Sequence, residues 1–400
     1  MAKPIEYLTG TDEAAAGRPF AHIIVSGHKG CGKSTELHRL QARLQAANYT
    51  VVYVDVASQV IADEMDVEAI VMAMIRALVE ARLPGLKEKH IDGAREWFAR
   101  VLQEKTAIRA AEIGVTAEAG LGGESPLLKL LAAFKGYIRQ ATEEKRTFEV
   151  EYKRYLGELA GQLSVLLARA REGVESGGRD GLVLILDGLD RVESRQLQDE
   201  VFVDNQALFA ELLSHTVFTV PISLVCSDAS RQVQDAFGEP CLLPCINLER
   251  EDGAGLDRGR DVVLRRCDGG LFEEGVVDYI CRQSGGDLRN IMRLLREAIG
   301  AAAGPRIAMA DAEAAFYSVA RGFANWLTPE DYEALARHHR DRHLSPTDDL
   351  GRRLLMAGAI LAYANHGNWF LVHPAVQALT GFRDALQGSR TASEENPDGT

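Results

Sequence analysis

The sequence predicts an α/β fold in which helices cover both faces of a parallel sheet. Short and nearly uninterrupted apolar runs recur along the chain, and helix-like stretches separate them, which is typical of strands that are buried on both faces. The chain has 400 residues and 46% hydrophobic content, enough for several domains with their own cores. The expected strands are AHIIVS at 21–26, TVVYVDV at 50–56, GLVLILD at 181–187, PISLVC at 221–226 and a weaker run near 241–248.

Three regions, at 84–180, 270–303 and 322–380, depart from the strand and helix alternation and set the predicted domain boundaries. Residues 84–180 are far longer than one crossover needs and have helical periodicity around 127–139 and 148–170, which predicts a helical insertion. The region after 320 gives helix, helix, strand, turn, strand and helix, the order of a winged helix. The predicted domains are a core at 1–250 containing the insertion at 84–180, a small helical lid at 251–320, a winged helix at 321–386 and a disordered tail at 387–400.

Composition and charge narrow the class of protein. The net charge of −13 repels nucleic acid over most of the surface, so DNA binding would need a local basic patch. The six cysteines have neither the paired spacing of a zinc site nor the density of a disulfide scaffold, which predicts reduced thiols. No signal peptide is visible, and no apolar run approaches the roughly 20 residues that span a bilayer. These features predict a soluble, cytoplasmic protein without a transmembrane segment.

The stretch GHKGCGKST, residues 27–35, fits the pattern G-x-x-x-x-G-K-[ST] between an expected strand and an expected helix. Glycines let successive backbone N–H groups curl around a phosphate, and the positive end of the following helix attracts it. Lys33 is expected to reach the β- and γ-phosphates, Ser34 to ligate Mg²⁺, and Thr35 to touch the α-phosphate. The predicted nucleotide-binding residues of the loop are Gly27, His28, Lys29, Gly30, Cys31, Gly32, Lys33, Ser34 and Thr35.

The sequence LVLILDGLDRV supplies the acid that should face this loop. Asp187 closes a run of apolar residues and is expected to hold Mg²⁺ through water. In many ATPases that contain this G-x-x-x-x-G-K-[ST] loop, the residue after the strand-end Asp is an acid that activates water. Here that position, 188, is a glycine. Two interpretations stay open: Asp190 takes the role of base, or hydrolysis is slow and the nucleotide serves mainly as a switch.

Together, GHKGCGKSTEL, LILDGLDRV and SGGDLRNIMRLLREA resemble the AAA+ and STAND (signal-transduction ATPases with numerous domains) branch of P-loop NTPases, over roughly residues 20–300. The resemblance implies that a polar residue after the fourth strand senses the γ-phosphate, and Ser227 or Asp228 is the candidate by position. It also places Arg289 where the lid arginine of this family contacts nucleotide phosphates, a contact that suits a guanidinium.

Two kinds of relative join a winged helix to such a lid: replication initiators (Orc/Cdc6-like) and STAND switches. FLVHPAVQAL, 370–379, resembles the segment after the wing in NOD-like resistance proteins and apoptosome ATPases. In those proteins a histidine that begins the last helix contacts the β-phosphate of ADP and holds the closed state, and His373 falls on it. Pro374 replaces the family's usual Asp.

The primary hypothesis is therefore an ATP-binding, slowly hydrolysing STAND-type switch that uses ATP, ADP and Mg²⁺. Because no repeat array is visible, the resemblance implies self-association and separate effector or sensor proteins as partners. The alternative is a DNA-associated AAA+ ATPase. It is disfavoured because the expected recognition helix, 346–357, carries Arg352 and Arg353 against Asp348 and Asp349. A small-molecule kinase is a third hypothesis, without a visible acceptor pocket. An amphipathic helix is predicted at 126–140 and is expected to pack within the insertion.

Overall fold

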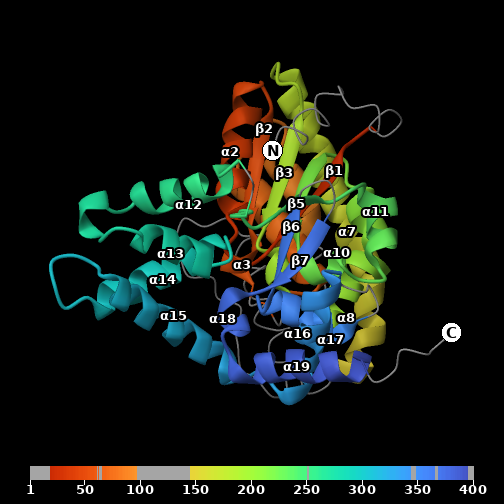
Figure 1. Ribbon diagram of the computed structural model, residues 1–400. Helices are drawn as coiled ribbons and strands as arrows, with labels where there is room; N and C mark the ends of the chain where they lie inside the picture. The colour runs from red at the N-terminus through yellow and green to blue at the C-terminus, as the bar shows by residue number, and fades with distance from the viewer. Residues whose placement is uncertain are drawn as a thin grey trace, which may run out of the picture. The chain divides into compact units, whose positions relative to one another are not determined.

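The computed structural model describes residues 19–60, 62, 65–96, 145–249, 252–343, 348–364 and 368–394 (Figure 1). The amphipathic helix predicted at 126–140 lies outside these residues. No helix within these ranges is both long and apolar enough to cross a membrane.

Five strands form one sheet in the order β2-β3-β4-β1-β5, and every strand pair with a resolved register is parallel. The strands are β1 (His22–Gly27), β2 (Thr50–Asp55), β3 (Leu182–Asp187), β4 (His215–Val220) and β5 (Cys241–Leu243). All six residues of β1 (HIIVSG) and of β3 (LVLILD) are buried, as is typical of strands in a parallel sheet that is covered on both faces. The predicted α/β fold with a parallel sheet is confirmed.

The strand predicted at 221–226 is wrong. The fourth strand is His215–Val220, and residues Ile222–Val225 form the short helix α10. Pro221 separates the two elements, because its ring lacks the amide hydrogen that a sheet needs and presets the dihedral of a helix start. The segment HTVFTV, with four β-branched residues and a phenylalanine, was the better strand pattern.

The chain divides into two compact units. The first contains residues up to Ile24, Ser34–Thr219 and Asp235–Glu239. The second contains Val25–Lys33, Val220–Gln234 and Pro240 onward.

In the first unit, long helices pack on the sheet through apolar stripes. Helix α2 (Lys33–Ala46) buries Leu37, Leu40 and Leu44, which recur on one helical face. Helix α4 (Val67–Glu80), capped by Asp66, packs against β2 and against α7 (Lys145–Ser176), which falls within the predicted insertion. The shorter helices are α3 (Val56–Gln59), α8 (Arg195–Asp199) and α9 (Gln206–Ala210), with a 3-10 turn at Leu189–Arg191 and a π-helical turn at Glu200–Asp204; α11 (Ser230–Phe237) spans both units.

In the second unit, a row of four helices leads into a helical domain with an antiparallel hairpin (Figure 1). The four helices, over the region predicted as a lid, are α12 (Ala254–Leu264), α13 (Val276–Gln283), α14 (Leu288–Ala301) and α15 (Met309–Ala324). The hairpin, drawn in blue, is β6 (Ile360–Ala364) with β7 (Asn368–Val372). Around it lie α16 (Pro329–Asp341), α17 (Asp349–Met356), α18 (Pro374–Gln377) and α19 (Thr380–Glu394). These elements follow the predicted winged-helix order, and α19 continues beyond residue 387, where the sequence predicted a disordered tail.

Candidate functional site

The glycine-rich turn follows β1 and runs directly into α2. Gly30 has a φ of +88°, and a Cβ at this position would lie 2.5 Å from Nε of Arg289. Only glycine therefore allows both the backbone conformation of the turn and the close approach of the arginine.

Lys33 is turned into this loop. Its Nζ donates hydrogen bonds to the carbonyl oxygens of Gly27 and His28, each at 2.8 Å, and the residue is buried. The ammonium group is therefore held inside the turn by the loop's own carbonyls. A phosphate that entered the loop would find a positive charge already at its centre.

His28 joins the loop to the hairpin strand β6. Its Nε2 accepts a hydrogen bond of 2.8 Å from the backbone N–H of Ala362. Burial, together with the charge of Lys33, lowers the pKa of His28 to about 3, so the imidazole is neutral and can accept this bond. The carbonyl of Ala362 in turn accepts the N–H of Cys245 at 3.0 Å. The N–H and the carbonyl of Ala362 are therefore both hydrogen-bonded to residues outside the hairpin, His28 and Cys245.

Arg289 lies in the first turn of α14, where the carboxylate of Asp287 accepts the Arg289 backbone N–H at 2.9 Å and caps the helix. The cap fixes the start of the helix, and the Arg289 side chain lies beside Gly30. The structure therefore brings the predicted lid arginine to the phosphate loop.

His373 caps α18, as a histidine at a helix start can. Its Nδ1 accepts the N–H of Ala375 at 3.0 Å, and its Nε2 lies 2.9 Å from the side-chain amide nitrogen of Asn290. The side chain is fully buried, and its ring is 5.0 Å from that of Phe323. Burial, with the nearby charges of Arg293 and His28, lowers its pKa to about 3. Both ring nitrogens of His373 therefore meet groups of the protein.

In the first unit, Asp187 ends β3 with both carboxylate oxygens engaged. Oδ2 accepts the hydroxyl of Tyr53 at 2.7 Å, and Oδ1 accepts the N–H of Gly188 at 2.8 Å. Burial and the neighbouring Asp187 raise the pKa of Tyr53, so the phenol stays protonated and donates. The Tyr53 ring stacks on His38 of α2 at 4.3 Å, one helical turn after Ser34. A chain of contacts thus links the first turn of α2 to Asp187.

Asp190 lies in the 3-10 turn that follows and is buried, with only 8% of its surface exposed. The turn is tied to β4, because the N–H of Leu189 donates to Oγ1 of Thr219 at 3.0 Å. Thr219 is a polar residue near the end of the fourth strand that sequence reasoning missed, since that strand was placed at 221–226. The β-branched residues of HTVFTV were the signal that could have located it.

Ser227 and Asp228 are engaged in local structure. The hydroxyl of Ser227 donates to the carbonyl of Leu224 at 2.7 Å and accepts the N–H of Ala229 at 3.2 Å, so it closes the turn after α10. Asp228 forms an ion pair with Arg352 at 3.5 Å. Because Ser227 does not directly follow a strand, its assignment as a phosphate sensor loses its positional basis.

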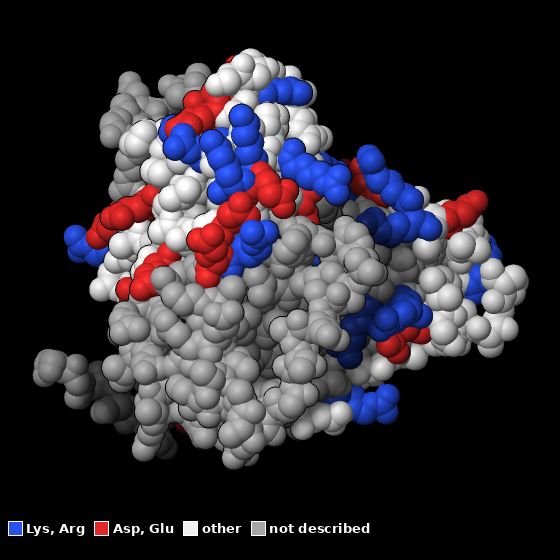
Figure 2. Space-filling model, turned by 180° about the vertical axis from the view of Figure 1, so that it is seen from behind, with Lys and Arg blue, Asp and Glu red and all other residues white. Residues whose placement is uncertain are grey.

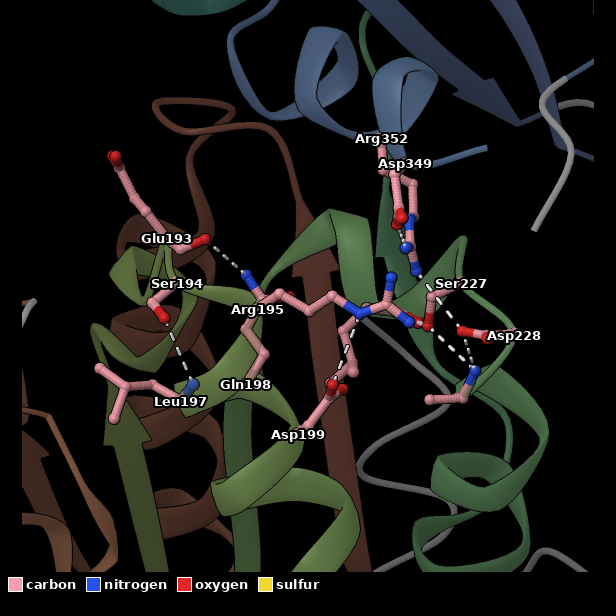
Figure 3. Close-up of polar contacts among 12 residues, drawn as sticks. Glu193, Ser194, Arg195, Leu197, Gln198, Asp199, Ser227, Asp228, Asp349 and Arg352 are labelled. Carbon is pink, nitrogen blue, oxygen red and sulfur yellow. Dashed lines mark hydrogen bonds and ion pairs between the residues drawn. The ribbon is translucent and has the colours of Figure 1, made fainter. Parts of the chain in front are cut away.

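The arginines of the expected recognition helix are paired with acids. Figure 3 shows Arg352 with Asp349 beside it, pointing toward the turn that carries Asp228. Arg352 is buried, and Arg353 pairs with the fully buried Asp331. On the face drawn in Figure 2, basic side chains are interspersed with acidic ones among the described residues. Neither arginine presents an unpaired charge for a DNA phosphate.

The donors fit a nucleotide-bound Mg²⁺ better than a protein-only metal site. Mg²⁺ usually keeps several waters and takes one or two protein ligands alongside substrate phosphates, and a hydroxyl at the start of α2 with the carboxylate of Asp187 is such a set. Within the described ranges, no group of three or more His, Cys, Asp or Glu is arranged to hold a metal ion by itself.

Comparisons with known proteins return structural likeness alone. No family model matches the chain, and no curated protein does. The solved structures it resembles include the Orc1 protein of Aeropyrum pernix in complex with DNA, at 15% identity and TM-score 0.39, covering 98% of this chain and 92% of that one. Cdc6p from Pyrobaculum aerophilum matches at 13% identity and TM-score 0.42, covering 97% and 93%. A RuvB mutant from Thermotoga maritima matches at 13% identity and TM-score 0.34, covering 92% and 91%.

Proposed function

We propose that this chain is an ATP-binding molecular switch that hydrolyses ATP slowly and changes conformation or assembly between its ADP and ATP states. The loop amides and Lys33 bind the phosphates, and Ser34 and Asp187 hold Mg²⁺, Asp187 through water. Thr35 and Arg289 add contacts to the nucleotide. Mg²⁺ supplies charge neutralisation at the β- and γ-phosphates when it is bound.

The observation that carries this proposal is the hydrogen bond from Ala362 to His28. A nucleotide loop that only bound substrate would need no direct bond to a C-terminal hairpin. Here the loop residue that accepts from the hairpin also offers its carbonyl to Lys33. If Lys33 turns toward a phosphate, it leaves that carbonyl, and the backbone that positions the His28 ring is released. Phosphate binding in the loop is thereby coupled to the hydrogen bond between His28 and Ala362 of the hairpin.

Arg289 and His373 supply the second connection, through helix α14. Arg289 lies beside the loop, and Asn290 of the same turn lies 2.9 Å from His373 at the start of α18. A change in the contact between Arg289 and phosphate therefore reaches the C-terminal domain through one helical turn. This arrangement supports a latch in which His373 acts through Asn290, with its proposed contact to the ADP β-phosphate requiring a rearrangement of that pair.

The proposal is tested with fluorescent ADP and ATP analogues on three proteins. Wild type is expected to bind both, and Lys33→Ala to bind neither, because the loop loses its central charge. His28→Ala keeps Lys33 and should still bind, but it is expected to release ADP about fivefold faster, since the loss of one buried hydrogen bond costs on the order of 1 kcal/mol. A wild-type protein that takes up no adenine or guanine nucleotide at millimolar concentration would end the proposal.

A DNA-associated ATPase is the competing function, and the ion pairs of Arg352 and Arg353 disfavour it. Binding to duplex DNA at low ionic strength separates the two functions, because phosphate contacts weaken steeply with salt. Tight binding that Arg352→Ala abolishes would favour the DNA function over the switch.

A further inference from the structure

We propose that Asp55, at the carboxyl end of β2, is the carboxylate that positions the attacking water and accepts its proton. This inference rests on the ATP-binding function proposed above and names the catalytic residue of its hydrolysis step.

Position 188, next to Asp187, cannot carry this acid. Gly188 has a φ of +93°, and a Cβ there would lie 2.5 Å from Cβ of Ala57 and 2.9 Å from the Ala57 backbone nitrogen. Helix α3 thus occupies the space where a side chain at 188 would stand. Any general base must come from another position.

Asp190, the nearest acid in the sequence, is buried in its 3-10 turn, whereas Asp55 is exposed at its strand end. A base must exchange its proton with solvent after each turnover. Exposure therefore favours Asp55 for this role, and burial favours a structural role for Asp190.

The strand register places Asp55 beside Asp187. The two residues are direct partners in the parallel pair of β2 and β3, so their side chains leave the same face of the sheet. Tyr53, two residues before Asp55, lies on this face too, and its hydroxyl reaches Oδ2 of Asp187. One face of two neighbouring strand ends therefore carries both carboxylates.

Helix α2 lies against that same face, as the stacking of His38 on Tyr53 shows. Ser34 is one helical turn before His38, so the first turn of α2, which follows the phosphate loop, is on the side of the sheet where Asp55 stands. Both carboxylate oxygens of Asp187 accept hydrogen bonds, whereas the carboxylate of the exposed Asp55 accepts one, from the backbone N–H of Ser58.

The step balances as a hydrolysis. The water oxygen forms a bond to the γ-phosphorus, and the bond from that phosphorus to the bridging oxygen breaks, its electron pair leaving with ADP. Asp55 takes one proton from the water and later releases it to solvent.

Asp55 also caps α3, because its Oδ1 accepts the N–H of Ser58 at 3.1 Å. The test must separate this structural role from the chemical one. Asp55→Asn and Asp55→Ser both keep a good capping oxygen but lose the basic carboxylate. Asp66 caps α4 in the same unit through Ala69 at 2.9 Å, so Asp66→Asn is the matched control.

The experiment follows conversion of protein-bound ATP to ADP over hours in a single turnover, with thermal unfolding and analogue affinity measured alongside. Asp55→Asn and Asp55→Ser are expected to slow conversion by about 100-fold or more, with unchanged unfolding midpoints. Asp66→Asn should convert ATP like wild type. Removing a negative charge near the γ-phosphate should also raise the affinity for a non-hydrolysable ATP analogue several-fold over that for ADP.

Wild-type conversion rates in both Asp55 variants would overturn the inference, as would an absence of conversion in wild type or a 100-fold loss confined to Asp190→Asn. In each of these cases nucleotide binding persists, so the nucleotide-dependent switch stands, although an absence of conversion in wild type removes its slow hydrolysis. A wild-type protein that binds no nucleotide would instead contradict both the switch proposal and the role of Asp55.

Discussion

His28 and His373 are two buried imidazoles of the same unit, and each accepts a backbone N–H that a protonated ring nitrogen could not accept. His28 faces Lys33, while His373 faces Arg293 and His28 and meets Asp287 only through Asn290. Positive neighbours and burial act in the same direction on both rings. Each is held neutral, which makes the fold sensitive to acid.

The pH dependence of stability follows with a definite sign. Both pKa values fall from 6.5 to about 3 on folding, so the unfolded chain binds more protons below pH 6.5. This stabilisation is complete above pH 6.5 and is lost as the pH falls toward 3. Between pH 7 and pH 5 each histidine should lower the free energy of unfolding by about 2 kcal/mol. Asp287, whose pKa burial raises, opposes part of this loss.

His373→Asn isolates one of the two contributions. Asparagine can cap α18 and stay near Asn290, but it takes up no proton. Urea unfolding at pH 7 and pH 5 should show an acid-induced loss about 2 kcal/mol smaller in this variant than in wild type. An acid-induced loss equal to that of wild type would mean that His373 is not one of the titrating groups.

At the scale of elements, the turn before α14 sets the lid arginine, and its geometry depends on Gly286. Its φ is +76°, and a Cβ there would lie 1.9 Å from the carbonyl oxygen of Ile246. Gly358, between α17 and β6, has the same φ of +76° with nothing within 4 Å of its added Cβ. The two positions differ in crowding and share their backbone conformation.

Alanine at these two glycines is therefore a matched comparison. Gly358→Ala should cost about 1–2 kcal/mol, the price of a left-handed residue. Gly286→Ala carries the same cost and must also displace the backbone of Ile246, so its unfolding free energy should fall further and nucleotide affinity should drop with it. Equal losses in both variants, measured by denaturant unfolding, would show that displacing the Ile246 backbone adds no measurable cost.

How far the sequence could predict these features depends on the range of the contacts. The loop at 27–35 and Asp187 could be picked out from the sequence as candidates, because each lies in a local motif next to an apolar strand. The partner of His28 is Ala362, 334 residues away, and no local pattern announces such a bond. Asp55 was invisible for a similar reason, since its place beside Asp187 follows from strand register. The fourth strand was misplaced because the apolar run after Pro221 outweighed the β-branched run before it.

At the scale of the whole molecule, the boundary between the two compact units falls inside the glycine-rich motif. Lys33 is the last residue of a segment that belongs with the lid and hairpin, and Ser34 is the first residue of a segment that belongs with β2, β3 and Asp187. Consecutive residues of one motif are therefore anchored in different compact units.

A switch needs more than tight binding, because a ligand with equal affinity for two states moves no population. Taking a protein from nearly all closed to nearly all open requires about 5.5 kcal/mol of differential affinity. Native mass measurement should accordingly find monomers with ADP and a larger assembly with a non-hydrolysable ATP analogue and Mg²⁺. His28→Ala should assemble at a lower analogue concentration, since its hairpin is less firmly held, and Lys33→Ala should give one mass with either nucleotide. One mass for wild type in both states, with bound nucleotide visible in the spectrum, would mean that the nucleotide does not control assembly.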